Sequence, residues 1–256
     1  MWLLHLHGAY ALLQQSQEFY DTDPQLSALI EMYNYICCMA SLTCEKVPPK
    51  FALRPPADFG DEHLNIHPLL GHSAESYWHL GNFNELCNRL QSEDTVSTIR
   101  QVKKGAQSIE LALQAGKPLH SPSLPRPMVE ARAAALTTRW AVIMRLQKFS
   151  QSTTNNETQP KHATDSILSA MSLIRPGSET EARLLFPLFM AGTGSDTKVN
   201  RLTVEYRINV METTVGFRNI VVAHRLLDEI WRRSNEGTVV DWEHLMRTKY
   251  PSLVLL

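Results

Sequence analysis

Apolar residues recur every three to four positions along most of the chain, and this spacing predicts α-helices. The clearest stripe follows Asp23 and Pro24, which have the preferences of an N-cap and of a first helical residue. Its narrow apolar face consists of Leu26, Ile30, Tyr33, Cys37, Ala40 and Cys44. Runs of alternating apolar and polar residues are nearly absent. The pattern therefore predicts an all-α protein.

Two further stripes are strong. The stretch 129–148 has one apolar face, with Glu130, Arg145 and Lys148 on the opposite side. The stretch Phe217 to Arg233 is apolar on two sides, which indicates a helix enclosed by its neighbours and ended by Gly237. Weaker patterns predict further helices, which brings the total to about ten; they cover residues 2–19, 73–90, 94–115, 163–174, 178–191, 196–214 and 241–249.

Breaks between the helices are marked by proline and by polar residues. Residues 47–60 and 117–127 hold four prolines each. The polar stretch 150–162 predicts a mobile surface loop, although a linker between two domains has the same composition. The helices on either side are too few to build two independent cores. We therefore favour one domain over residues 1–256, with consecutive helices packed as antiparallel pairs.

Charge and hydropathy exclude two classes of partner. The 256 residues include 25 Lys+Arg and 26 Asp+Glu, a net charge of −1. That balance gives no field to hold a polyanion, so we expect no direct contact with nucleic acid. The longest apolar stretch, Leu184 to Gly192, is far shorter than the roughly 20 residues that cross a bilayer. Met1 to Leu4 also lacks the basic segment of a secretory signal, and we expect no membrane association.

The four cysteines are predicted to be structural. Cys37 and Cys44 lie about 10 Å apart along one predicted helix, too far for a disulfide or for one shared metal ion. Cys38 and Cys87 complete the set. We interpret all four as reduced, small apolar residues of an intracellular protein.

Histidines form one cluster that resembles a metal site. His63 and His67 have the spacing of zinc ligands on a helix, and His72 and His79 follow them. Because Pro68 pushes His67 out of the helical conformation, we expect no metal site here. His5 and His7, near the start of the chain, point to different helix faces and cannot converge on one ion.

His224 and Trp231 are the candidate residues of a ligand pocket. His224 lies within the apolar stripe of 217–233, where its imidazole would be desolvated. One interpretation is a core histidine bonded to a backbone carbonyl or a carboxylate. The other is a polar contact in an apolar pocket, or a general base. Phosphate-binding loops and serine or zinc hydrolase motifs are absent, so no catalytic residue is assigned and no cofactor is expected.

Several ordered segments resemble one family. They are Trp2–Ala9 (WLLHLHGA), His67–Gly71 (HPLLG), Leu185–Gly192 (LFPLFMAG) with Arg201 after it, and Trp231 followed by Asp241–Met246 (DWEHLM). In this order they resemble the second fungal-specific transcription factor domain, the regulatory region of fungal zinc-cluster transcription factors. The resemblance implies an all-helical module of a nuclear protein, active in the regulation of secondary metabolism. It would sense a hydrophobic small molecule or contact a coregulator protein, while DNA is bound elsewhere.

The chain departs from the family in lacking the six-cysteine zinc cluster, and it starts at a helix that lies inside the family's domain. We therefore expect a domain truncated at its N-terminal side, a mis-started gene model, or a family scaffold with another use. A family scaffold with another use suggests an alternative function, namely a cofactor-independent cyclase or isomerase that shapes a hydrophobic natural product beside His224. A structural partner that forms a homodimer or heterodimer is a third alternative. Outside the nucleus, the expected location is cytoplasmic.

Overall fold

The computed structural model describes residues 2–19, 22–42, 44, 47–51, 74–92, 96–114, 125–150, 158–251 and 253–256. Within these ranges every regular element is helical, which confirms the predicted all-α fold. The 3₁₀ turns are η1 (Gln17–Phe19) and η3 (Glu181–Arg183). The α-helices are α1 (Trp2–Gln15), α2 (Pro24–Ala40), α3 (Ala74–Ser92), α4 (Val96–Gln114), α5 (Arg126–Ser150), α6 (Thr158–Met171), α7 (Leu185–Thr193), α8 (Lys198–Thr214), α9 (Arg218–Asn235) and α10 (Trp242–Lys249).

Side-chain caps begin three of the helices. The Asp23 carboxylate accepts hydrogen bonds from the backbone N–H groups of Gln25 (2.9 Å) and Leu26 (3.3 Å), with Pro24 at the first helical position. Thr197 caps α8 and Asp241 caps α10 in the same way. These side chains satisfy backbone donors that a helix leaves unpaired at its start.

Two boundaries differ from the sequence prediction. α6 begins at Thr158, so residues 158–162 are helical; residues 151–157 of the expected loop lie outside the described ranges. The helix expected over 178–191 is split into η3 and α7. Pro187 explains this break, because it has no N–H to donate and its ring would clash with the carbonyl of Arg183 in a continuous helix.

A further boundary moves a cysteine out of a helix. α2 ends at Ala40, so Cys44 lies beyond the helix. The prediction that Cys37 and Cys44 belong to one helical stripe was therefore wrong. The Cys44 thiol donates a hydrogen bond to the carbonyl of Pro251, 3.0 Å away. All four cysteines are free thiols, as the sequence predicted.

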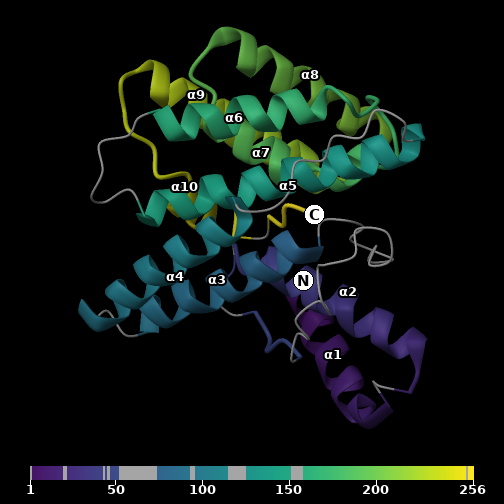
Figure 1. Cartoon of the computed structure of the whole chain (residues 1–256). Helices are drawn as coiled ribbons and strands as arrows, with labels where there is room; N and C mark the ends of the chain where they lie inside the picture. The colour runs from purple at the N-terminus through teal and green to yellow at the C-terminus, as the bar shows by residue number, and fades with distance from the viewer. Residues whose placement is uncertain are drawn as a thin grey trace.

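α7 lies at the centre of the main hydrophobic core. Every residue from Leu185 to Gly192 is buried, and the helix packs against α5, α6, α8 and α9 (Figure 1). A side chain at Gly192 would collide with Leu227 of α9, since a Cβ there would lie 2.7 Å from two Leu227 carbons. The longest apolar run in the chain is thus an internal helix. None of the described helices combines the length and apolar character required to span a membrane.

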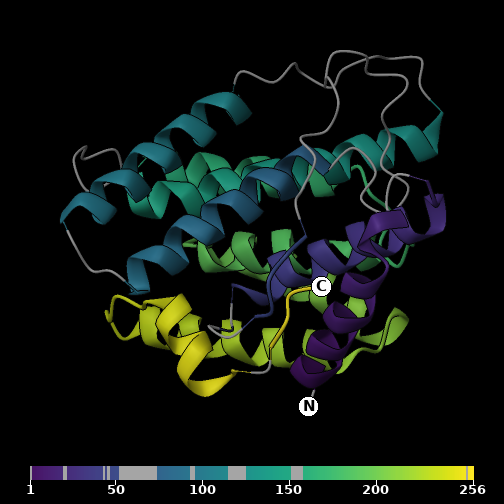
Figure 2. The same ribbon diagram turned by 90° about the horizontal axis from the view of Figure 1, so that it is seen from below.

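The α1 and α2 helices form a smaller unit at one end of the molecule (Figure 1). Their shared core contains Leu6, Ile30, Tyr33 and Phe51. The C-terminal tail runs beside this unit in both views (Figures 1 and 2), and residues 253–255 are buried in the main core. The C-terminal tail is therefore anchored in the main core, beside the unit formed by α1 and α2.

Candidate functional site

The two predicted pocket residues lie on one helix and have different partners. His224 and Trp231 both lie on α9, seven residues or about 10 Å apart along its axis. The Nδ1 atom of His224 lies 2.8 Å from a carboxylate oxygen of Glu212 on α8, and the imidazole is mostly buried. A carboxylate partner was one of the interpretations that the sequence left open for this histidine.

Trp231 is bonded into the core. Its indole N–H donates to the carbonyl of Gly192 in α7, 2.9 Å away. The guanidinium of Arg201 lies over the ring, 5.8 Å from its centroid, and donates to the carbonyl of Ser195 and to Asn235. Trp231 therefore joins α7, α8 and α9, and its polar group already has a partner within the chain.

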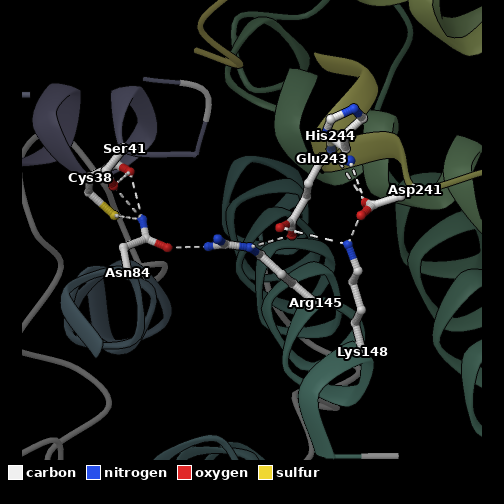
Figure 3. Close-up of polar contacts among 8 residues, drawn as sticks. All are labelled: Cys38, Ser41, Asn84, Arg145, Lys148, Asp241, Glu243 and His244. Carbon is white, nitrogen blue, oxygen red and sulfur yellow. Dashed lines mark hydrogen bonds and ion pairs between the residues drawn. The ribbon is translucent and has the colours of Figure 1, made fainter. Parts of the chain in front are cut away.

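A larger cluster of polar groups surrounds Arg145 of α5 (Figure 3). The sequence pattern placed Arg145 opposite the apolar stripe of its helix, a position typical of solvent exposure. In the structure only 1% of Arg145 is exposed. The reason is that α5 packs against α3, α4, α6 and α7, so both its faces are covered.

Each end of the Arg145 guanidinium is bonded to a different helix. Nε donates to the carboxylate of Glu243 in α10 (3.3 Å), and Nη1 donates to the side-chain carbonyl of Asn84 in α3 (Figure 3). The group also lies 5.5 Å from the ring centroid of Phe83. A buried cation requires such partners, because an unpaired charge in the core is strongly disfavoured.

Asn84 extends the cluster to a fourth helix. Its amide nitrogen donates to the carbonyl of Cys38 (2.9 Å) and to the hydroxyl of Ser41 (2.6 Å), at the end of α2. We call Ser41, Asn84, Arg145 and Glu243 the Arg145 network. It links α2, α3, α5 and α10 through side chains up to 202 positions apart in the sequence (41 to 243).

Lys148 attaches the beginning of α10 to α5. Its ammonium lies 2.8 Å from Asp241, the N-cap of α10, and 3.8 Å from Glu243 (Figure 3). Partial burial would raise the pKa of Asp241, but the ammonium and the backbone N–H groups of the first turn together hold it below the usual value. The Asp241 carboxylate is therefore ionised at neutral pH and can cap the helix.

Other buried charges were also missed by the sequence analysis. Glu181 in η3 forms an ion pair with Arg207 of α8 (2.5 Å) and accepts a hydrogen bond from the N–H of Gly177. Glu130, placed by the pattern on the polar side of α5, is only 3% exposed and pairs with Arg175 (2.7 Å). The spacing of apolar and polar residues in one sequence cannot distinguish a buried, paired charge from a solvated one.

The described cysteines near the Arg145 network are not nucleophiles at neutral pH. Burial raises the pKa of the Cys38 thiol to about 12, and that of Cys87 to about 11. Cysteine side chains react as thiolates, and the thiols of Cys38 and Cys87 remain protonated at neutral pH. The four side chains of the Arg145 network thus hold helices together, and none of them is a reactive group. The network is therefore a structural connection between helices.

The predicted histidine cluster is described only in part. His63, His67 and His72 lie outside the described residues. His79 lies on α3, 4.0 Å from Glu75, and burial lowers its pKa. The residues that the structure describes contain no group of three or more metal-binding side chains.

Comparison with known proteins shows the family of the chain. A family model described as "Fungal specific transcription factor domain" matches residues 1–255, nearly the whole chain. This is the family that the ordered segments resembled. No curated protein and no solved structure matches the chain.

Proposed function

Since this chain belongs to the fungal specific transcription factor domain family, we propose that it is the regulatory domain of a fungal zinc-cluster-type transcriptional regulator. It senses a hydrophobic small molecule or a coregulator protein, acts in the nucleus, and does not itself contact DNA. The observation that carries the proposal is the family match over residues 1–255. A domain of the transcription-regulator type follows from that match directly.

The charge distribution supports a role without DNA contact. The net charge is −1, and one of the two pairs of adjacent basic residues, Arg232 and Arg233, is bound to the nearby carboxylates of Glu236 and Glu229. DNA-binding surfaces need free cations to replace the counterions of the phosphates. Fluorescence anisotropy with a labelled duplex tests this point: we expect no binding at physiological salt, and tight binding that weakens steeply with salt would refute it.

The Arg145 network supports a role in transmitting a signal. A regulatory domain must convert binding at one surface into a change at another, and the network joins helices from both ends of the chain. Arg145 contacts α3 on one side and α10 on the other. A ligand that moves either helix has to rearrange the same guanidinium.

A tethering experiment tests the regulatory function. The chain is fused to a zinc-cluster DNA-binding module in a fungal cell, and a reporter gene carrying that module's site is measured. We expect reporter output to differ several-fold from that of the module alone. Arg145→Met should abolish the difference, whereas Arg232→Met, at an exposed arginine, should leave it unchanged. Output equal to that of the module alone would contradict the proposal.

The alternative of a cofactor-independent cyclase or isomerase has one observation in its favour. A general base needs a partner that fixes its orientation, and Glu212 lies 2.8 Å from Nδ1 of His224. The test is product formation from hydrophobic biosynthetic intermediates by the wild type and His224→Ala. Equal rates would remove His224 from any catalytic role, and no product from either would count against the catalytic alternative.

A further inference from the structure

The outer side of α8 carries exposed apolar side chains. Val199, Leu202 and Tyr206 are 71%, 53% and 57% exposed. Their spacing of three and four residues places them along one face of the helix, which we call the α8 stripe. The opposite face, with Val204 and Ile208, is fully buried. Figure 1 shows α8 along the top of the molecule, with no other helix on its outer side.

The edges of the α8 stripe differ in charge. At about 100° per residue, Lys198 and Glu205 lie on the same edge of the stripe, about two turns apart. Thr203 and Val210 lie on the other edge and are uncharged. Within the described part of the chain, neither Lys198 nor Glu205 takes part in an ion pair, whereas the nearby Asp196 pairs with Lys161. One edge therefore has a free cation near its start and a free anion further along.

We propose that the α8 stripe is the interface between two copies of this chain. The helices run antiparallel across a two-fold axis between Leu202 and Thr203, so that Leu202 packs beside Leu202 of the second copy and Val199 faces Tyr206 of that copy. A two-fold interface needs a surface that is complementary to itself. An apolar stripe centred on the axis meets this requirement.

The charged edge fixes the direction of the two helices. In an antiparallel pair centred between Leu202 and Thr203, Glu205 lies opposite Asn200 of the second copy, two residues or about 3 Å from Lys198 of that copy. The symmetry gives two equivalent ion pairs. A parallel pair would place the charged edge against Thr203 and Val210 and would form neither. Charge complementarity therefore favours the antiparallel homodimer.

The size of the stripe sets the strength of the dimer. Three exposed side chains of these types bury a few hundred Å² at most, of order half of the roughly 800 Å² per partner in a stable interface. The remaining area has to come from the polar rim. We therefore expect a dimer that dissociates on dilution in the micromolar range.

Sedimentation velocity of the purified chain over a range of concentrations tests the proposal. The wild type should shift from monomer to dimer with rising concentration. Leu202→Asp, which buries two carboxylates at the axis, should raise the dissociation constant more than about tenfold. The matched control is Leu173→Asp, because Leu173 is 52% exposed and lies outside α8. It should dimerise as the wild type does, and circular dichroism confirms that each variant is folded.

A charge exchange tests the register. Lys198→Glu and Glu205→Lys should each weaken the dimer, and the double variant should restore it. A wild type that stays monomeric at the highest attainable concentration overturns the proposal. So does a dimer that Leu202→Asp leaves intact, or a double variant as weak as the single ones.

Discussion

Replacing Arg145 with methionine tests the Arg145 network most directly. The change removes the cation but keeps an unbranched apolar side chain in a site that is 1% exposed. Glu243 and Asn84 then lose the donor that now binds them. Removing one partner of a buried ion pair destabilises a protein by about 3–5 kcal/mol.

We expect a value near the lower end of that range. Glu243 keeps Lys148 3.8 Å away, which leaves its carboxylate partly compensated. A loss of about 3 kcal/mol lowers the melting temperature of a chain of this length by about 6–12 °C. Urea denaturation followed by far-UV circular dichroism measures the free energy of unfolding.

A double-mutant cycle separates the pair from other effects. Glu243→Leu alone should also destabilise the chain, because it leaves the guanidinium without its anion. The double variant should be more stable than the sum predicts by at least about 1.5 kcal/mol, since it leaves no buried unpaired charge. Arg232→Met is the control, because exposed ion pairs contribute less than about 1 kcal/mol. Additive losses within about 0.5 kcal/mol would refute the coupling.

Three further predictions concern other parts of the fold. Gly192→Ala should destabilise the chain by about 1–3 kcal/mol in thermal unfolding, because the added Cβ would lie 2.7 Å from Leu227. Adding Leu227→Ala to this variant should recover part of the lost stability. If it recovers none, the steric explanation is wrong. Hydrogen bonds from Lys249 and then Arg233 lower the pKa of Glu229 to about 2. The contribution of ionised Glu229 to stability is thus present above the ordinary carboxyl pKa and lost as the pH falls toward 2. The Lys249→Gln variant should raise the midpoint of the Glu229 titration, measured by NMR. A midpoint near 4.5 in the wild type would contradict the lowered pKa. Burial raises the pKa of Cys38 to about 12, so iodoacetamide at pH 8 should not label it in the folded chain, whereas labelling as fast as in urea would count against burial.

Local patterns in the sequence predicted the helices well. Asp23 and Pro24 mark the start of α2, and the stretch 217–233 became the helix α9. The prediction that this helix is enclosed was wrong, because one side of α9, with Arg225, Asp228 and Arg232, is exposed. The predictions of the helices themselves depend on residues within one or two turns of each other, and such interactions form in almost any tertiary context. The break before α7 is equally local, since Pro187 acts through the carbonyl four residues earlier, although the apolar pattern predicted one continuous helix over 178–191.

The candidate site was harder to predict. His224 and Trp231 were selected from one stripe, but the neighbouring helices gave each a separate partner. Whether either contacts a ligand stays a prediction. Arg145 was predicted to lie on the polar face of its helix. The pattern on α5 does not show whether other helices cover that face.

The sequence by itself determined which stretches become helices, where the capped helix α2 begins, and which family the chain resembles. Helix periodicity and capping act between near neighbours, so one sequence is enough to read them. Only the tertiary structure decided that Arg145 is buried, since its partners Asn84 and Glu243 lie 61 and 98 positions away. The environment of a charge depends on helices that are distant in sequence, and the pattern on its own helix contains no information about them.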